Sequence, residues 1–438
     1  MSSEAKRLRT GPATSERRKI SVIGSSAVHI GNGLLSSIPG EVVAKVKASR
    51  FVIVSDANVW ALYGNALVDA FLALGTFTMP GESRLVGSYG KDATTAPAGV
   101  LTEAGKKLLI TYQVPVGEET KSREVKDAIE DFMLAHKCNR DTCMLALGGG
   151  VTGDLVGFVA ATYMRGVPFV QIPTSTMAMI DSSVGGKTAI NVPAGKNLIG
   201  AFYQPIDVYA DLDLLKSLGK REIAEGICEA VKMGCIHKPK LFELLEAHPE
   251  EVMALEPALI NEVIYQSVLG KAEVVAADEK EAGVRATLNW GHTVGHGIEA
   301  MKSPAMMHGE CVAIGCVVEG ELALRMGHES LTREKMERVA RCFASYGLPI
   351  HVPAGLNEET MFKKIGMDKK NVGNSIRCTI VTDIGVSIPD PQPCEWRLIA
   401  QVIADSVNAG SQLPEWQPHE GNHDKTSSGH AGGFMGGR

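Results

Sequence analysis

The 438-residue chain lacks several features that define special classes of protein. It has no apolar run approaching about 18 residues, so we expect no membrane span. It has no excess of basic residues, because 44 Lys and Arg side chains stand against 50 Asp and Glu and give a net charge of −6. A mildly acidic chain is not attracted to nucleic acid as a whole, so any anionic ligand must be bound by local clusters of basic groups.

A disulfide framework is also missing from the pattern. The nine cysteines are an odd number, no two are spaced as C-x-x-C, and several lie inside apolar runs. This distribution predicts reduced thiols in a cytosol-like compartment rather than disulfides or a thiolate metal site. Residues 1–19 are basic and lack the apolar stretch of a secretory signal, so we expect a disordered start and a cytoplasmic protein, with a plastid or another organelle as the alternative.

Glycine, by contrast, is plentiful. The 47 glycines make up about 11% of the chain against a usual ~7%. Such an excess indicates either a flexible low-complexity segment or backbone that comes close to phosphates and tight turns. Residues 409–438 are rich in Gly, His and Ser without periodicity, so we predict a disordered tail there. Most of the other glycines belong to the part that we expect to fold.

Two regions of different texture lie between these ends. In residues 20–205, short β-rich runs such as RFVIVSDAN and TCMLALGGG alternate with helical stretches. This alternation predicts an α/β domain with a parallel, Rossmann-like sheet, helices on both faces, and a ligand site at the carboxyl ends of the strands. Residues 206–408 predict a mainly α-helical second domain, with a short strand or hairpin near 376–388. The polar segment 76–106 predicts a surface excursion.

One glycine motif stands where a nucleotide site would need it. The strand TCMLAL runs into Gly148-Gly149-Gly150-Val151-Thr152-Gly153 and then into an apolar helix, which satisfies G-x-G-x-x-G in a strand–turn–helix context. A tight turn without a ligand would use the same residues. Asp56, at the end of an earlier strand, is placed either to accept a ribose hydroxyl or to cap the next helix.

A second group of residues is basic. Lys187 and Lys196 follow glycine-rich segments, and Arg165 follows the preceding helix. The run Gly186-Lys187-Thr188 imitates a P-loop, but the first glycine of that motif would fall at Asp181, so the P-loop interpretation fails. We predict that the two lysines lie on glycine-rich loops and bind a phosphate or carboxylate; solvated surface lysines are the alternative.

The helical region contains residues of the type that bind metals. Glu229 and Lys232 are spaced i, i+3 on one helix face, and a surface ion pair is the simple interpretation of that spacing. His292 and His296 are spaced i, i+4, and spacing alone nominates them as a ligand pair, completed by another His and a Glu. Satisfied core histidines are the alternative. With Lys271 and Arg285, these residues suit a small, anionic, polyhydroxylated substrate that NAD oxidises beside a metal.

Long stretches of the sequence resemble 3-dehydroquinate synthases. They are GGGVTGDLVGFVAATYMRGVPFVQIPTSTMAMIDSSVGGKTAINVPAGKNLIGAFYQP, EGICEAVK, DEKEAGVRATLNWGHTVGHGIEA and HGECVAIG. The resemblance covers about residues 20–400 and is nearest to the first domain of fungal pentafunctional polypeptides. It implies an NAD-binding α/β domain followed by an α-helical domain, usually in a homodimer.

The resemblance also implies particular site residues. Zinc or cobalt ligands, for one divalent ion per subunit, fall on Glu229, His292 and His308, so His296 becomes a substrate-side group. Substrate positions fall on Asp181, Lys187, Asn197, Arg165, Lys232, Lys271, Arg285, Asn289, His296 and Lys369. NAD positions fall on Asp56, Asn58, Glu118, Lys121, Gly149, Gly150, Val151, Asp154, Thr174, Ser175, Lys196 and Glu222.

The implied reaction converts 3-deoxy-D-arabino-heptulosonate 7-phosphate, an anionic sugar phosphate, to 3-dehydroquinate and phosphate in the shikimate pathway. NAD oxidises a ring hydroxyl, phosphate leaves by β-elimination, the hydride returns, and ring opening and an aldol step close the carbocycle. Two departures from the family are the length of segment 76–106 and Ser175, where a threonine is usual.

Three alternative functions remain at this stage. A sedoheptulose 7-phosphate cyclase would tend to replace Asn289, His296 and Lys369, all of which are present. A metal-dependent polyol dehydrogenase shares the two-domain plan but needs no lysine cluster for phosphate. A non-enzymatic metal-binding scaffold would be expected to have lost some of the metal or lysine positions.

Overall fold

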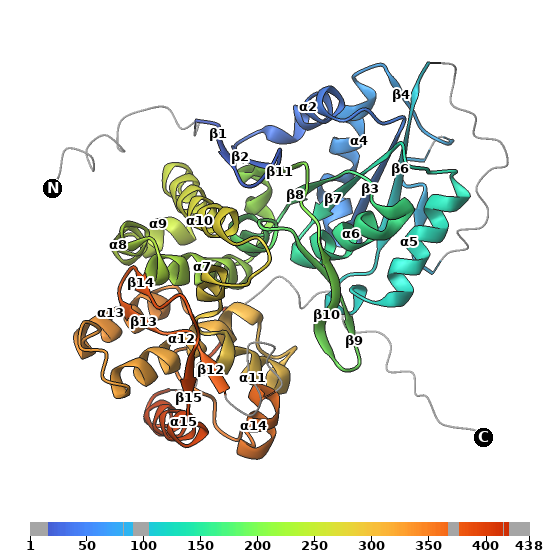
Figure 1. Ribbon diagram of the computed structural model, residues 1–438. Helices are drawn as coiled ribbons and strands as arrows, with labels where there is room; N and C mark the ends of the chain where they lie inside the picture. Colours follow the sequence, from blue (N-terminus) through green and yellow to red (C-terminus); the bar gives the residue numbers. More distant parts are fainter. Residues whose placement is uncertain (1–15, 82, 91–104, 367–375, 415, 420–438) are drawn as a thin grey trace, which may run out of the picture.

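The computed structural model describes residues 16–81, 83–90, 105–366, 376–414 and 416–419. One half of the molecule is built on a sheet and the other half is a group of helices (Figure 1). This order confirms the predicted fold class, an α/β part followed by a mainly helical part.

A nine-stranded sheet forms the first half. Its strands lie in the order β1-β2-β11-β8-β7-β3-β6-β4, and β5 also pairs with β6. β1 and β2 are antiparallel, whereas the other described pairs are parallel, as predicted from the strand–helix alternation. The strands are β1 (Arg18–Ser21), β2 (Ala27–Gly31), β3 (Arg50–Asp56), β4 (Phe77–Thr78), β5 (Gly87–Ser88), β6 (Lys107–Val114), β7 (Thr142–Gly148), β8 (Phe169–Pro173) and β11 (Asp207–Asp211).

A hydrophobic core covers each face of the sheet. Consecutive side chains of a strand point to opposite faces, so one strand contributes to both cores. Phe51 and Ile53 of β3 belong to one hydrophobic core, and Val52 and Val54 belong to the other. The helices of the first face are α2 (Ile38–Lys45) and α4 (Asn65–Leu72), preceded by η1 (Leu34–Ser36), α3 (Ala57–Val59) and η2 (Trp60–Gly64). Those of the second face are α5 (Arg123–Ala135) and α6 (Gly150–Thr162).

The predicted domain boundary at 205/206 is wrong by a few residues. β11 (Asp207–Asp211) lies inside the sheet, paired with β2 and β8, so the α/β part extends to Asp211. The sequence pattern did not assign this strand to the α/β part, because it is a single strand directly before η6 (Leu212–Ser217) and the helices of the second half.

Segment 76–106 is also more regular than the surface excursion predicted for it. Phe77–Thr78 and Gly87–Ser88 form β4 and β5, which both pair with β6. The described residues of this segment therefore add two short strands to the sheet. Residue 82 and residues 91–104 lie outside the described part of the chain.

The second half consists of helices around α7 (Lys220–Ile236), which packs against α8, α10, α12 and η5 (Ala178–Ser182). The hairpin β13 (Val381–Asp383) and β14 (Val386–Ser387) confirms the strands predicted near 376–388, and β12 (Ile376–Cys378) pairs with β15 (Gln392–Cys394). The other helices are α8 (Pro239–Ala247), α9 (Pro249–Met253), α10 (Pro257–Ala277), η7 (Val284–Asn289), α11 (His292–Lys302), α12 (His308–Arg325), α13 (Arg333–Ser345), α14 (Glu358–Gly366) and α15 (Trp396–Gly410).

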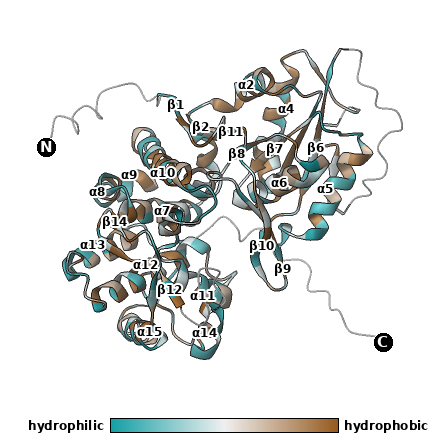
Figure 2. Ribbon diagram, in the orientation of Figure 1, coloured by the Kyte–Doolittle hydropathy of each residue, from teal (hydrophilic) through white to brown (hydrophobic). Residues whose placement is uncertain are grey.

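Hydrophobic residues concentrate on the strands of the sheet, whereas helix α5 carries both hydrophilic and hydrophobic residues (Figure 2). All nine cysteines are buried and free, so no disulfide contributes to the fold. Among the described residues, no helix combines the length and apolarity that a membrane crossing requires.

Candidate functional site

The carboxyl ends of four neighbouring strands bring the predicted NAD-binding residues to one edge of the sheet. Asp56 ends β3, Glu118 follows β6 in η3 (Glu118–Thr120), Gly149 follows β7, and Thr174 follows β8. Because β8, β7, β3 and β6 are adjacent and parallel, these positions form a continuous row. The crevice beside such an edge is the usual ligand site of an open α/β sheet.

The glycine motif lies at the N-terminus of α6, as predicted. Gly149 is the N-cap of the helix, and Gly150 and Val151 form its first turn. A Cβ atom on Gly150 would lie 2.8 Å from Oγ of Ser182, so a side chain there would crowd η5. The free N–H groups of this turn are suited to bind an anion.

Asp56 acts as a helix cap, which is the alternative that the sequence left open. Its Oδ1 accepts hydrogen bonds from the backbone N–H groups of Asn58 at 2.9 Å and Val59 at 3.0 Å. Burial raises the pKa of the Asp56 carboxyl, and these backbone hydrogen bonds oppose the rise. A capping role does not exclude a ribose contact, because a carboxylate can accept several hydrogen bonds.

Lys121 is the centre of a polar cluster beside this edge. Its Nζ donates to Oδ2 of Asp154 at 2.7 Å and to Oδ1 of Asn197 at 2.5 Å. Glu118 joins the cluster through Asn191, whose Nδ2 donates to Oε1 of Glu118 at 2.8 Å. The structure thus places Asn197, predicted as a substrate contact, among the predicted NAD-binding residues.

The two lysines do not lie on loops, so that prediction is wrong. Lys187 begins β9 (Lys187–Val192), and Lys196 belongs to β10 (Gly195–Phe202), the two strands of one antiparallel hairpin. Gly185, with φ +100°, lies just before the hairpin, and a Cβ atom there would lie 2.6 Å from Nη2 of Arg285. Gly185 therefore permits the close approach of this turn to Arg285.

Both hairpin lysines meet carboxylates from the helical half. Lys187 lies 2.7 Å from Oε2 of Glu281, and Lys196 donates to Oε1 of Glu299 at 2.7 Å. The hairpin thus connects the α/β half to the segment before η7 and to α11.

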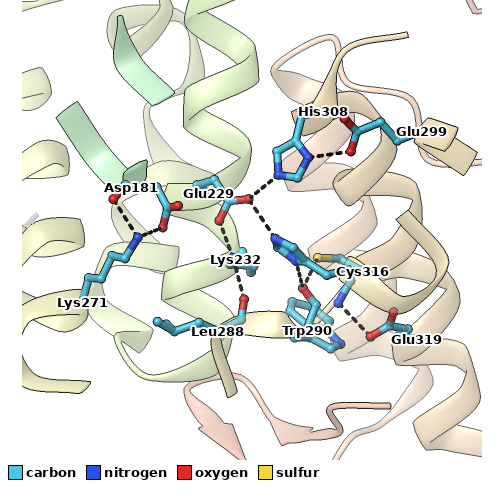
Figure 3. Close-up of polar contacts among 12 residues, drawn as sticks. Asp181, Glu229, Lys232, Lys271, Leu288, Trp290, Glu299, His308, Cys316 and Glu319 are labelled. Carbon is cyan, nitrogen blue, oxygen red and sulfur yellow. Dashed lines mark hydrogen bonds and ion pairs between the residues drawn. The ribbon is translucent and has the colours of Figure 1, made fainter. Parts of the chain in front are cut away.

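Two further basic residues, Lys271 and Lys232, are buried between the halves. Lys271 of α10 donates to the backbone oxygen of Asp181 at 2.6 Å and to its Oδ1 at 2.7 Å (Figure 3). Lys232 of α7 forms an ion pair with Glu229 and donates to the carbonyl of Leu288 at 2.7 Å. The Glu229–Lys232 pair is deeply buried, so the interpretation as a surface ion pair is wrong.

Burial acts on these charges in two directions. It lowers the pKa of Lys271, although Asp181 opposes that effect. Burial alone would raise the pKa of Asp181, but Lys271 and Lys232 hold it well below its ordinary value. Asp181 is therefore ionised beside two ammonium groups.

Arg285 and Asn289 lie on η7, at the other side of this group. Nη2 of Arg285 donates to the carbonyl of Gly185 at 2.9 Å, and the side chain is almost fully buried. Nδ2 of Asn289 donates at 2.9 Å to Oε1 of Glu281, the carboxylate that also pairs with Lys187. Glu281 therefore connects two predicted substrate contacts.

A candidate metal centre lies beside Lys232. Oε1 of Glu229 lies 3.9 Å from Nε2 of His292 and 3.8 Å from Nε2 of His308 (Figure 3). The three ligand atoms lie within 4.8 Å of one another. A zinc ion with bonds of about 2.0–2.2 Å can bridge atoms about 4 Å apart, so small shifts would bring all three into contact with one ion.

The two histidines present the correct nitrogen to such an ion. Nδ1–H of His292 donates to the carbonyl of Trp290 at 3.1 Å, which leaves Nε2 as the free donor atom. Burial, together with Lys232 and the neighbouring histidines, holds the pKa of His292 well below its ordinary value, so its ring is neutral. Nδ1–H of His308 donates to Oε2 of Glu299 at 2.9 Å. Burial lowers the pKa of His308, but Glu299 and nearby carboxylates outweigh burial and raise it to about 9.

The spacing argument that paired His292 with His296 is not supported by the geometry. In the described residues, the two possible ligand groups are Glu229 with His292 and His308, and His296 with Glu299 and His308. The rings of His292 and His296 have centroids 5.0 Å apart, yet their nitrogens converge on no common group. The packing of α12 against both α7 and α11 brings the three residues of the first set together.

Sequence reasoning missed two carboxylates of this site. Glu281 stands in the motif DEKEAG, and Glu299 follows His292 by seven residues and His296 by three. That i, i+4, i+7 spacing places all three residues on one helix face, so a search for helical periodicity could have found Glu299.

Three predicted site residues remain apart from these contacts. Arg165 ends η4 (Tyr163–Arg165), is exposed, and has no hydrogen bond or ion pair within the described part of the chain. Glu222 lies in the first turn of α7, where its backbone carbonyl accepts from Oγ1 of Thr176 at 2.7 Å. Lys369 lies outside the described residues.

Comparison with protein families identifies the architecture that carries this site. The model described as 3-dehydroquinate synthase N-terminal matches residues 111–225, and the model described as 3-dehydroquinate synthase C-terminal matches residues 226–371. The two matches are adjacent and together span more than half of the chain. The chain belongs to the 3-dehydroquinate synthase family.

Curated relatives of this 3-dehydroquinate synthase family member include fungal multifunctional proteins. The chain is 40% identical over 389 residues to Pentafunctional AROM polypeptide 1 of Lodderomyces elongisporus, and 41% identical over 390 residues to the Pentafunctional AROM polypeptide of Candida tropicalis. Each match covers 84% of this chain but 23% of the relative. The chain thus spans about a quarter of the length of these relatives.

Solved structures with this fold include cyclases and dehydrogenases. ValA, a 2-epi-5-epi-valiolone synthase from Streptomyces hygroscopicus with NAD+ and Zn2+ bound, has a TM-score of 0.72 and 25% identity over 90% of this chain and 99% of its own. A 2-deoxy-scyllo-inosose synthase complexed with carbaglucose-6-phosphate, NAD+ and Co2+ has a TM-score of 0.75 and 22% identity over 89% of this chain and 100% of its own. The glycerol dehydrogenase of Schizosaccharomyces pombe has a TM-score of 0.59 and 17% identity over 92% of this chain and 98% of its own.

Proposed function

We propose that this protein is a 3-dehydroquinate synthase, a carbon–oxygen lyase that converts 3-deoxy-D-arabino-heptulosonate 7-phosphate to 3-dehydroquinate and phosphate. The observation that supports this most is the position of Lys232. This buried ammonium pairs with Glu229 of the candidate metal centre and helps to hold Asp181 ionised beside Lys271. A polyol dehydrogenase has no need for such a cluster of buried cations, whereas the removal of a phosphate does.

NAD is the cofactor that we propose for the edge of the sheet. The N-terminus of α6 offers N–H groups to a diphosphate, and Asp56 ends the neighbouring strand β3. Lys121, Asp154 and Glu118 provide polar groups beside them. The ValA and 2-deoxy-scyllo-inosose synthase structures, which share this fold, are both described with NAD+.

Zinc or cobalt is the metal that we propose for Glu229, His292 and His308. The donor set fits, because it offers two imidazole nitrogens and one carboxylate, a combination found in catalytic zinc sites. Oε1 of Glu229 is buried and lacks a hydrogen bond, and the other carboxylate oxygen forms the ion pair with Lys232. When bound, the ion would polarise a substrate hydroxyl for oxidation by NAD.

The chain's own residues would bind and orient the substrate between the two halves. Lys271, Lys232 and Arg285 are buried, so their charges act on a substrate anion with little screening by water. Lys187 and Asn289, held together by Glu281, are positioned to add a contact from the hairpin side. These cations would stabilise the phosphate as it leaves, and Asp181 would hold Lys271 in place.

His296, Lys369 and Arg165 complete the proposed substrate set, as the family resemblance implies. His296 is exposed at the same helix face as the metal ligand His292, where it can reach a substrate bound to the metal. We also propose that the protein is cytoplasmic and forms a homodimer. Size-exclusion chromatography with light scattering would test the homodimer.

Phosphate release tests the proposed reaction. Purified full-length protein is supplied with NAD, zinc and either 3-deoxy-D-arabino-heptulosonate 7-phosphate or sedoheptulose 7-phosphate. We expect phosphate and 3-dehydroquinate from the first substrate, without accumulation of NADH. Phosphate from sedoheptulose 7-phosphate alone would favour a cyclase of the ValA type, and stoichiometric NADH from a polyol would favour a dehydrogenase.

The metal assignment has its own test. We expect His308→Ala to lose both bound metal and phosphate release, since it removes one of three ligands. Retention of both properties would show that His308 is not a ligand.

A further inference from the structure

The two histidines of the candidate metal centre occupy equivalent positions on adjacent helices. His292 is the first residue of α11, and His308 is the first residue of α12. The two helices pack against each other so closely that a Cβ atom on Gly315 of α12 would lie 1.9 Å from the carbonyl oxygen of Gly291. Each histidine is therefore within reach of side chains from the opposite helix.

Glu319 of α12 holds the beginning of α11. Its Oε2 accepts from the backbone N–H of Gly291 at 2.8 Å, and its Oε1 accepts from the N–H of Val294 at 3.0 Å. These N–H groups belong to the first turn of a helix that has no side-chain cap of its own. Because Glu319 is fully buried, the two bonds fix the backbone on both sides of His292.

The same segment receives a second contact from α12. The thiol of Cys316 donates to the carbonyl of Trp290 at 3.8 Å, and this carbonyl is the acceptor for Nδ1–H of His292. The ring of His292 is thus oriented through a backbone that α12 holds in place.

Glu299 of α11, in turn, orients the histidine ligand at the start of α12. Its Oε2 accepts Nδ1–H of His308 at 2.9 Å, so Nε2 of His308 is directed towards Glu229. Its Oε1 accepts from Lys196 of β10 at 2.7 Å, so both carboxylate oxygens are engaged. A carboxylate bonded to the second nitrogen of a ligating histidine fixes the ring and strengthens the ligand.

We propose that Glu299 and Glu319 are positioning residues of the metal centre, each fixing the histidine ligand carried by the other helix. This inference rests on the metal centre of the proposed function. It predicts that the metal affinity depends on two carboxylates that do not touch the ion.

Cobalt binding to the metal-free, full-length protein tests the inference. The variants are Glu299→Gln and Glu319→Gln, and the measurement is titration with Co2+ followed by its visible absorption. We expect each variant to bind Co2+ about 10- to 100-fold more weakly than the unchanged protein. The absorption bands of bound Co2+ should also shift, because they report the ligand geometry.

Glu321→Gln is the matched control. Glu321 is also on α12, but its carboxylate pairs with Arg325 and Arg333, outside the metal centre. We expect this variant to bind Co2+ within about twofold of the unchanged protein. The thermal midpoint of each metal-free variant is recorded, so that a general loss of stability is separated from a loss of affinity.

The outcomes are distinct. If the unchanged protein binds Co2+ and both Gln variants bind it within twofold with the same spectrum, the inference is wrong while the metal centre stands. If the unchanged protein binds no Co2+, the metal centre itself is wrong and the inference falls with it. Should Glu319→Gln fail to fold, Glu319→Asp keeps the charge but withdraws it by one carbon, and we expect the same loss of affinity.

Discussion

At the scale of single residues, the site is organised by buried charges that are paired. Asp181 and Lys271 form one pair, and Glu229 and Lys232 form another. Pairing does not by itself make a buried ion pair stabilising, because desolvation offsets the attraction between the charges. Their presence is better explained by the ligand than by the fold.

This explanation predicts different effects on stability and on activity. Lys271→Met should reduce kcat/KM by about 10²- to 10³-fold, since in the proposed site it removes a charge that faces the substrate. It should also lower the free energy of unfolding by about 1–3 kcal/mol, because Asp181 loses its partner. In the double variant Asp181→Asn, Lys271→Met, we expect stability to recover but activity to stay low. Urea unfolding and initial-rate kinetics measure the two quantities; recovery of activity with stability would contradict the interpretation.

A second charged cluster, at the sheet, has a role in stability. Asp207 of β11 accepts from Lys45 at 2.8 Å and lies 3.2 Å from Nε2 of His29. Burial alone would raise the pKa of Asp207, but the hydrogen bonds from His29 and Lys45 lower it below its ordinary value. Because the pKa of Asp207 is lowered in the folded state, its ionised carboxylate stabilises the fold. This contribution is complete above the unfolded-state pKa of about 3.9, and it is lost as the pH falls through the lower pKa of the folded state.

Asp207→Asn should therefore lower the free energy of unfolding by about 1–3 kcal/mol at pH 7. The difference from the unchanged protein should stay constant down to about pH 5 and shrink below about pH 4. Urea unfolding at pH 7, 5 and 3.5 measures it. Asp69→Asn is the control, because Asp69 pairs with Arg84 at an exposed position and should contribute less than about 1 kcal/mol. A difference that is as large at pH 3.5 as at pH 7 would show that Asp207 does not act through its charge.

At the scale of elements, close helix contacts depend on glycine. Gly315 lets α12 approach the start of α11, and Gly309 lets α12 approach α7, where a Cβ atom would lie 2.4 Å from the carbonyl oxygen of Glu225. These contacts set the distance between Glu229 on α7 and the two histidines. Helical periodicity in the sequence predicts that these helices form, but it does not predict the distance between them.

Gly315→Ala should disturb this packing. The added methyl group would overlap the carbonyl of Gly291, so we expect a loss of about 1–3 kcal/mol in unfolding free energy and weaker metal binding. Gly40→Ala is the control, since nothing lies within 4 Å of its Cβ position on helix α2. That variant should gain about 0.5–1 kcal/mol. Denaturant unfolding compares the two; equal effects would show that the α11–α12 contact tolerates a side chain.

At the scale of the whole molecule, the chain places all nine thiols inside the fold. Burial raises the pKa of Cys143 to about 12 and that of Cys138 to about 11. Because the thiolate is the reactive form, buried thiols with raised pKa values react slowly.

An aromatic disulfide reagent should therefore label few thiols in the native protein and all nine after denaturation without reductant. The colour released by the reagent measures both numbers. Fewer than nine thiols after denaturation would reveal a disulfide, and rapid reaction of several thiols in the native state would contradict their burial.

Local sequence patterns were enough to predict the order of the two halves, the doubly covered sheet and the glycine turn at α6. These features depend on local periodicity and turn chemistry, which residues near one another in the chain decide. Local patterns failed at β11, a single strand next to the helical half, and at Lys187 and Lys196, whose hairpin has no strong alternation.

Which side chains meet in the site depends on the packing of separate elements. His292 and His296 are equally good ligands by spacing, and only the packing of α12 against both α7 and α11 places Glu229 beside His292 and His308. The roles of Glu299 and Glu319 were decided in the same way, because each acts on a helix other than its own. Spacing along one helix fixes which side chains share a face, but the approach of separate helices determines which faces come together.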